Sequence, residues 1–213
     1  YTPFINKQII EQDIKSIKQK LDDELLKSFQ SILKQIPKTG QLKIAFEVGK
    51  VYIMRIINLD LKEIKAGNTL IINALEMPFL NDIKLKHGSI KLKGIIDRID
   101  TINNETRLID YKTGSTELNE LTIKKAENVI EGKMPKALQL MCYKIAVHEK
   151  YPNAIVGIIS LKSNYCEFLP LNSSNSDFNK TESYENYLAL LNDIIHKITH
   201  DTIEFSHNSK SQY

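Results

Sequence analysis

The sequence predicts a mixed α/β domain in which helices flank a central sheet. Apolar residues recur at three- or four-residue steps over residues 8–65, 136–150 and 181–199, which is typical of amphipathic helices. Shorter stretches between these segments have the apolar runs and turn residues that are typical of strands. The 213 residues are 42% hydrophobic and 26% charged, which suits one globular domain with an ordinary core.

Two helices are expected in the first third of the chain. Residues 8–36 should form the first helix, which Pro37 and Gly40 end. Residues 41–65 should form the second helix, with Gly67 as its C-terminal cap. The second helix is apolar on most sides, so we expect it to be buried.

We expect residues 1–66 to form a helical segment that packs on a core made by residues 67–213. Both parts are expected to belong to a single domain. The chain opens on Tyr1 rather than on Met, so we expect it to be part of a larger protein.

Turn and breaker residues divide the rest of the chain. Pro78 places the end of the first strand at an edge or a bend, because proline cannot donate to a sheet ladder. Asn103 and Asn104 mark a tight turn, since asparagine tolerates left-handed backbone angles. Residues 115–132 are expected to form a loop or short helix, and the tail after Phe205 to be loose. Strands are expected at 69–79, 89–99, 107–113, 153–162 and 166–169, and a Ser/Asn-rich loop at 172–177.

Charge, apolar runs and cysteines exclude several classes of protein. The net charge of +3 is too small to argue by itself for a nucleic-acid partner. No apolar stretch is long enough to cross a bilayer, and no signal peptide is visible. Cys142 and Cys166 form no CxxC pair and no disulfide framework. We therefore expect a cytoplasmic protein with no membrane contact.

The stretch that carries chemistry is the hairpin around Asn103. If the strands pair symmetrically across the two asparagines, Asp100 faces Arg107, and Asp97 faces Asp110. Opposed residues have Cβ atoms about 4.5–5.5 Å apart, so two carboxylates at this spacing repel each other. The pair becomes favourable when a divalent cation lies between the carboxylate oxygens.

Lys112 adds a positive charge to this pair. It follows Asp110 by two positions and therefore lies on the same face, roughly 6.6–6.8 Å along the strand. Two carboxylates and an ammonium could hold Mg²⁺, orient a water and neutralise charge that develops on a phosphorus atom. The alternative is a set of ordinary solvated charges, which is the commoner meaning of a lone DxK. The opposed Asp97 and the apolar flanking residues favour the functional interpretation.

Three motifs resemble the nuclease domain of RecB-like enzymes. They are GIIDRID at 94–100, LIDYKTG at 108–114 and QLMCY at 139–143. These enzymes belong to the PD-(D/E)XK superfamily, and the branch most similar to this chain is the AddB-type subunit of bacterial helicase–nucleases. The resemblance implies a restriction-endonuclease-like core, a central mixed sheet flanked by helices. It also implies Mg²⁺- or Mn²⁺-dependent, exonuclease-type hydrolysis of DNA in repair or recombination, with single-stranded DNA or duplex ends as the substrate and a helicase region or subunit as partner.

The resemblance also implies roles for individual residues. Asp97 and Asp110 match metal-binding carboxylates, and the carbonyl of Tyr111 would complete the metal shell. Lys112 matches the lysine that positions or activates the attacking water.

Further residues match auxiliary positions. Gln139 and Tyr143 match a QxxxY helix that borders the site and contacts DNA. Glu76 matches an acidic position before the metal strand, to which we assign only a supporting role. Lysines that precede the QxxxY helix would grip the DNA backbone: Lys124, Lys125, Lys133 and Lys136.

Two departures from the family pattern leave other interpretations open. The family usually has a metal-binding histidine in a GxxxH helix before the domain, but this chain has no histidine before His87. The domain could therefore be a catalytically inactive module that binds DNA or has a structural role. A weaker possibility is a Mg²⁺-dependent enzyme that acts on small phosphate esters. Cys142 and Cys166 do not match the iron–sulfur cysteines of the AddB branch, so no iron–sulfur cluster is expected.

Other polar residues have ordinary explanations beside functional ones. His196 and His200 lie four apart and could bind a metal, but a solvated helix face is favoured, and His207 in the tail is a poor third ligand. Cys142 is expected to be a buried structural thiol. A set of lysines could contact phosphates or simply line the exposed side of a hairpin: Lys84, Lys86, Lys91 and Lys93.

Overall fold

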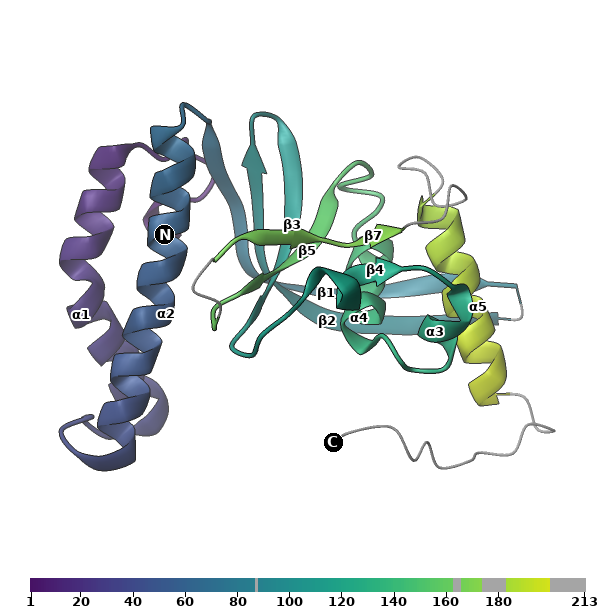
Figure 1. The fold of residues 1–213 in the computed structure, drawn as a ribbon, viewed down its shortest axis with the longest axis horizontal. Helices are drawn as coiled ribbons and strands as arrows, with labels where there is room; N and C mark the ends of the chain where they lie inside the picture. Colours follow the sequence, from purple (N-terminus) through teal and green to yellow (C-terminus); the bar gives the residue numbers. More distant parts are fainter. Residues whose placement is uncertain (87, 163–165, 174–182, 200–213) are drawn as a thin grey trace.

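The structure, a computed structural model, describes residues 1–86, 88–162, 166–173 and 183–199 (Figure 1). The expected loop beyond residue 173, the tail after Phe205 and three of the histidines (His87, His200 and His207) lie outside the described residues. The helices are α1 (Glu11–Leu33), α2 (Gly40–Lys65), α3 (Ala126–Ile130), α4 (Pro135–Ala146) and α5 (Ser183–Thr199), with 3₁₀ turns at Thr2–Phe4 and Leu118–Leu121. The strands are β1 (Leu70–Leu85), β2 (Gly88–Ile102), β3 (Glu105–Lys112), β4 (Thr122–Ile123), β5 (Ile155–Ser160), β6 (Phe168–Pro170) and β7 (Asn172–Ser173).

A mixed sheet forms the centre of the described part of the chain. Its strands have the order β1-β2-β3-β5-β6. β1, β2 and β3 pair antiparallel, β3 pairs parallel with β5, and β6 returns antiparallel to β5. The helix α4 lies between β3 and β5 in the chain and forms the crossover that a parallel pair requires. The predicted α/β class with a mixed sheet and flanking helices is confirmed.

The two faces of the sheet are covered by different helices. On β3, Leu108 is buried in the core that α4 and α5 complete. The next residue, Ile109, points to the other face and packs with Tyr52, Ile56 and Leu59 of α2. Successive residues of a strand point to opposite faces, so β3 has a buried side chain on each face and is a central strand. In Figure 1 the α1–α2 pair lies at one end of the molecule and α5 at the other.

The ends of the two long helices differ in how well the sequence predicted them. α2 ends with Gly67 in the left-handed conformation, and the N–H groups of Gly67 and Asn68 donate to the carbonyls of Ile64 and Glu63. This is a Schellman motif, as the predicted glycine cap implies. Gly40 does not end the first helix: α1 already ends at Leu33, and Gly40 begins α2.

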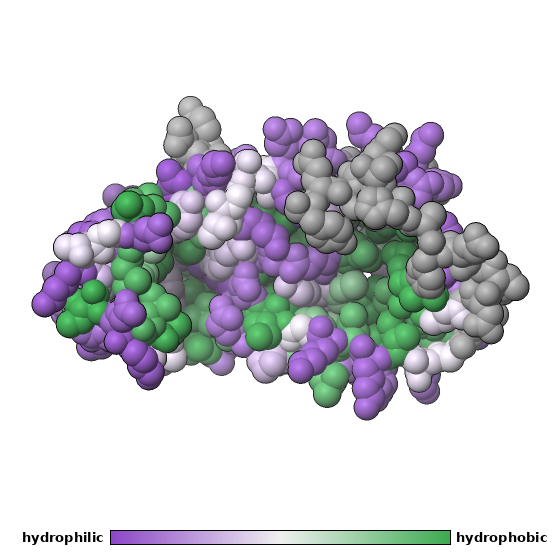
Figure 2. All heavy atoms as spheres, turned by 90° about the horizontal axis from the view of Figure 1, so that it is seen from below, coloured by the Kyte–Doolittle hydropathy of each residue, from purple (hydrophilic) through white to green (hydrophobic). Residues whose placement is uncertain are grey.

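The expectation that α2 is buried is wrong for its N-terminal half. Ile44, Val48 and Val51 lie on one side of the helix and are exposed, Ile44 by 64%. The opposite side carries Phe46 and Ile57, which are buried against α1 and the sheet. The helical pair extends past the sheet, so nothing in the described part of the chain covers this outer stripe. Figure 2 shows green, hydrophobic side chains at the end of the molecule that the helical pair forms.

The first two strands are longer than expected and form a bent arm. β1 continues to Leu85, six residues beyond the predicted end, and pairs with β2 as far as Leu85↔Gly88. Pro78 lies inside β1, which is an edge strand, so its missing N–H breaks no ladder bond on the free side. Figure 1 shows both strands turning sharply near their middle.

The β2–β3 hairpin has the predicted register. Its paired residues include Asp100↔Arg107 and Ile99↔Leu108. Asn103 and Asn104 form the two-residue turn, both with positive φ (49° and 70°), which is the type I′ geometry that matches strand twist.

Within the described residues, no helix has the length and apolar character that a membrane crossing requires.

Gly157 of β5 should tolerate no side chain. A Cβ atom there would lie 2.4 Å from the carbonyl oxygen of Leu169 and 2.7 Å from the ring of Phe168. Because backbone cannot move aside as a flexible side chain can, we expect Gly157→Ala to lower the free energy of unfolding by about 1–3 kcal/mol. Gly49→Ala is the matched control, since that position in α2 is open and alanine should stabilise the helix by about 1 kcal/mol. Urea denaturation measures both, and equal stability of the two variants would contradict the packing described.

Candidate active site

The predicted site residues converge where β2 and β3 separate. The backbone pairing of these strands runs from Ile102↔Glu105 to Arg98↔Ile109. Asp97 and Asp110 would be the next pair, but the ladder stops before them. The backbone pairing is therefore interrupted at the position where the sequence placed two opposed carboxylates, and we call this interruption the gap.

Asp97 partly closes this gap. Its Oδ2 accepts a hydrogen bond of 2.7 Å from the backbone N–H of Tyr111. The N–H and C=O of a strand residue point to the same edge, so the carbonyl of Tyr111 is also directed toward β2. Two carboxylates and one carbonyl thus border the gap, which are the oxygen ligands that hard divalent cations prefer.

Asp110 is held by the helix α4. Its Oδ1 accepts hydrogen bonds from Gln139 Nε2 (3.0 Å) and from the Tyr143 hydroxyl (3.2 Å). Gln139 and Tyr143 are one helical turn apart, and Gln139 Nε2 also lies 2.9 Å from the Tyr143 hydroxyl. The QxxxY segment therefore lies against Asp110 and fixes this carboxylate from one side.

Lys112 completes the group. Its Nζ lies 2.8 Å from Asp110 Oδ2 and donates a 2.8 Å hydrogen bond to Gln139 Oε1. The side chain of Lys112 is partly exposed, whereas Asp110 is buried. Asp110 Oδ2 is a buried oxygen for which the described residues provide this ion pair but no hydrogen bond. A cation that binds this oxygen would share it with the Lys112 ammonium.

The electrostatics of the gap favour a cation as well. Burial raises the pKa of Asp97, and the neighbouring carboxylates of Asp110 and Glu76 raise it further. The Tyr111 N–H and the Lys112 ammonium act in the opposite direction, but the net pKa shift is upward. An upward shift means that the ionised carboxylate is disfavoured in this setting. A divalent cation would remove this cost.

Glu76 of β1 lies opposite Asp97 of β2 and has an unusual backbone conformation. It is the residue between the printed pairs Leu75↔Arg98 and Met77↔Ile96, and its φ is 47°. A left-handed conformation is uncommon for a residue with a side chain, and in a strand it marks a bend. Glu76 is exposed beside the gap.

The described residues fit a magnesium-type site better than a transition-metal site. No group of three or more His, Cys, Asp or Glu side chains lies close enough together among them to hold a metal ion. Mg²⁺ needs only one or two carboxylates, because waters and substrate phosphates fill its other positions. Asp97, Asp110 and the Tyr111 carbonyl match that requirement.

The predicted DNA-contacting lysines are near the start of α4. Lys124, Lys133 and Lys136 line a surface pocket of about 370 Å³, together with Asn119 and Asn128. Lys136 also donates to the carbonyl of Ser115 and pairs with Glu120. Lys125 is exposed next to this pocket.

The other candidate groups lie outside this site. His196 lies on α5, and its proposed partner His200 is outside the described residues. Cys142 lies on α4 as a free, half-buried thiol whose pKa is raised by burial. A solvated helix face for His196 and a structural thiol for Cys142 therefore remain our interpretations.

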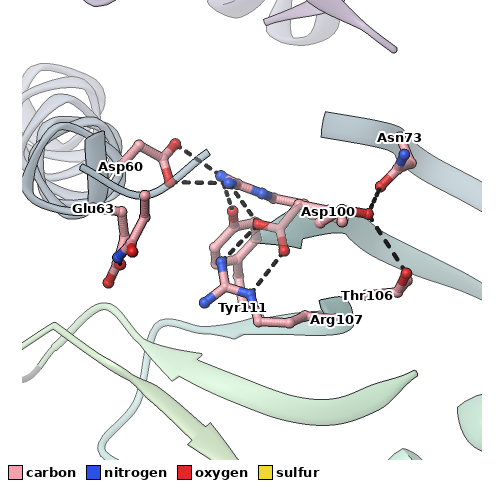
Figure 3. A network of polar contacts seen from close by, with 10 residues as sticks. Asp60, Glu63, Asn73, Asp100, Thr106, Arg107 and Tyr111 are labelled. Carbon is pink, nitrogen blue, oxygen red and sulfur yellow. Dashed lines mark hydrogen bonds and ion pairs between the residues drawn. The ribbon is translucent and has the colours of Figure 1, made fainter. Parts of the chain in front are cut away.

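A buried ion network behind the site was not predicted. Arg98 is 1% exposed, and its guanidinium donates two 2.9 Å hydrogen bonds to Asp60 of α2. Its Nη2 also lies 2.6 Å from Asp100, which in turn accepts two 2.8 Å hydrogen bonds from Arg107. Figure 3 shows Asp60, Asp100, Arg107 and Tyr111 gathered in this network.

Tyr111 connects the network to the site. Its backbone N–H binds Asp97, while its hydroxyl lies 3.4 Å from Arg98 Nη1 on the opposite face. Burial raises the pKa of Tyr111 to about 12, so the hydroxyl stays neutral. Tyr1 donates a 2.5 Å hydrogen bond to Asp60. The network thus joins the N-terminal segment, α2, β2 and β3. An aspartate between Leu59 and Leu61 was the available signal, but its distant partner could not be read from the sequence.

Removal of Asp60 should be costly. Asp60→Ala leaves Arg98 buried with one fewer counter-charge, which typically costs about 3–5 kcal/mol. Asp22→Ala is the matched control, because it breaks an exposed ion pair with Lys50 on the same helical pair and should cost at most about 1 kcal/mol. Chemical denaturation tests this difference, and similar losses in the two variants would show that the network does not stabilise the fold.

Comparison with known proteins assigns the family. A family model described as "PD-(D/E)XK nuclease superfamily" matches residues 8–213. No curated protein matches the chain. A solved structure described as "Crystal structure of SSO0001" is 14% identical, with a TM-score of 0.32 over 86% of this chain and 77% of that chain, a likeness too weak to argue from. The family model covers almost the whole chain, the gap and α4 included, and the chain therefore belongs to the PD-(D/E)XK nuclease superfamily.

Proposed function

We propose that this domain is a Mg²⁺- or Mn²⁺-dependent deoxyribonuclease with exonuclease-type activity. The observation that carries the proposal is the gap between β2 and β3, where two carboxylates, a backbone carbonyl and a lysine face one another. Superfamily membership supports nuclease chemistry. The GIIDRID and LIDYKTG motifs support the finer placement with RecB- or AddB-like proteins of DNA repair or recombination, with a cytoplasmic location and a helicase region or subunit as partner.

Asp97, Asp110 and the Tyr111 carbonyl would hold the metal ion. A bound Mg²⁺ or Mn²⁺ supplies Lewis-acid stabilisation of the phosphoryl oxygens and lowers the pKa of a bound water. Gln139 and Tyr143 keep Asp110 oriented through its Oδ1, and a cation at Oδ2 would share that oxygen with the Lys112 ammonium. The pKa of Tyr143 is raised by burial and by the Asp110 charge, so its hydroxyl remains a neutral hydrogen-bond donor.

Lys112 would act on the water and on the phosphate. Its ammonium already lies between Asp110 and Gln139 and is partly exposed to the gap. From this position it can orient the attacking water and neutralise charge that builds on the phosphorus oxygens. Glu76, whose charge acts on Asp97, would have a supporting role at the same edge. The lysine-lined pocket at the start of α4, with Lys125 beside it, would hold the DNA backbone by phosphate contacts.

A second candidate function is a nuclease-fold module without catalysis. The observation that favours it is that the described residues gather no third His, Cys, Asp or Glu ligand around the gap. Such a module would bind DNA with no need of Mn²⁺. An enzyme for small phosphate esters is a weaker candidate, and DNA would not compete with its substrate.

Cleavage of linear DNA in Mn²⁺ tests the proposal. We expect Asp110→Ala to lose measurable cleavage and Lys112→Ala to lose about 10²–10³-fold, because each removes electrostatic stabilisation of the reacting phosphate. Both variants should remain folded by circular dichroism. Cleavage at the wild-type rate in either variant would overturn the assigned site, and a wild-type protein that binds DNA without cleaving it would favour the inactive module.

Thermal melting with and without Mn²⁺ tests the metal ligands separately. Asp97→Asn should not lower the melting temperature of the metal-free protein at neutral pH, since its raised pKa means that the charged form is destabilising there. The amide oxygen can still accept the Tyr111 N–H. Mn²⁺ should raise the melting temperature of the wild type and of the control Asp193→Asn, but not that of Asp97→Asn. An equal Mn²⁺ effect in all three proteins would exclude Asp97 as a ligand.

A further inference from the structure

The arm formed by residues 77–85 of β1 and 88–96 of β2 has one face without a partner among the described residues. Its inner face carries Phe79, Ile83 and Ile96, which are buried with α4 and α5. The outer face consists of the alternate residues, paired across the strands as Pro78↔Ile95, Leu80↔Lys93, Asp82↔Lys91 and Lys84↔Ser89. All of these outer residues are exposed.

The outer face combines positive charge with exposed apolar side chains. Lys84, Lys91 and Lys93 outnumber Asp82, its single acidic residue among these pairs. Leu80 is 63% exposed and Ile95 50%, and the two are diagonal neighbours across the strands, so they form a small apolar cluster with Pro78. Lysines on an edge strand sometimes have no role beyond the prevention of aggregation. Here an exposed leucine and isoleucine lie beside them, and such residues promote aggregation.

This face is continuous with the gap between β2 and β3. Along β2, every second residue from Lys91 leads through Lys93 and Ile95 to Asp97. Six residues of strand span roughly 20 Å, so the lysines lie within reach of a chain that occupies the gap. On β1, the same alternation leads from Leu80 and Pro78 to Glu76, whose charge acts on Asp97.

A single-stranded nucleic acid fits this face better than a duplex. Its phosphates can pair with ammonium groups, and its unpaired bases offer apolar surface to aliphatic side chains. A duplex hides its bases in the stack and would leave Leu80 and Ile95 against charged backbone.

We propose that the outer face of the arm binds single-stranded DNA and guides it to the gap, with phosphates on Lys84, Lys91 and Lys93 and bases against Leu80 and Ile95. The inference rests on the proposed nuclease function, because the bound strand would lead to the gap. It adds a binding surface that the motifs do not specify. We call this outer face, with Lys84, Lys91, Lys93, Leu80 and Ile95, the track.

Fluorescence anisotropy with a labelled oligothymidylate tests the track in chelator, where metal-dependent cleavage is silent. Each phosphate contact to single-stranded DNA contributes about 0.7 to the slope of log affinity against log salt. The double variant Lys91→Gln with Lys93→Gln should therefore bind several-fold more weakly and lose about 1.4 from that slope, for two contacts. Leu80→Ala with Ile95→Ala should weaken binding and leave the slope unchanged.

The charge-matched control is Lys15→Gln with Lys20→Gln on α1, at the far end of the molecule (Figure 1). It should bind as the wild type does. Equal losses in the two lysine pairs, or no loss in either, would overturn the track, and a loss confined to blunt duplex would overturn the choice of single-stranded DNA. Cleavage is measured separately in Mn²⁺, so a domain that binds through the arm but does not cleave would contradict the nuclease proposal and leave the track standing.

Discussion

The ion network around Arg98 is the interaction on which the geometry of the site depends. β2 and β3 lose their backbone pairing at Asp97, where the proposed metal ion would lie, so the ladder does not fix the strands there. Arg98 lies immediately beside Asp97 and binds Asp60 from α2, Asp100 from its own strand and the hydroxyl of Tyr111 from β3. On the face of the sheet that α2 covers, these side-chain contacts connect β2 and β3 beyond the last backbone pair.

The same network gives the N-terminal helices a role in the site. α1 and α2 contribute no residue to the gap, and the outer stripe of α2 is exposed. Asp60 nevertheless connects this helical pair to the strand segment that carries Asp97, and Tyr1 binds Asp60 from the other side. On the front face α4 plays the corresponding part, because Gln139 and Tyr143 fix Asp110. The carboxylates are therefore positioned from both faces of the sheet.

The sequence predicted what local rules determine. The Asn103–Asn104 turn sets the hairpin register, and the register places Asp97 and Asp110 at the same end. The four-residue spacing of Gln139 and Tyr143 places both on one helical face. Local rules could not reveal that Arg98 pairs with Asp60, since the partners meet only through tertiary packing. They also could not show which apolar side of α2 is covered. Pro78 led to a predicted end of β1 that is too early, because an edge strand tolerates a proline in its interior.

The central claim is that the gap between β2 and β3 binds a divalent cation through the two carboxylates. Anomalous diffraction from crystals soaked in Mn²⁺ tests it most directly, because manganese can be located without reference to any activity. The account predicts one strong anomalous peak between Asp97 and Asp110, in contact with the Tyr111 carbonyl and next to Lys112. A saturating soak that leaves this gap without a peak, or places manganese elsewhere in the domain, would contradict it.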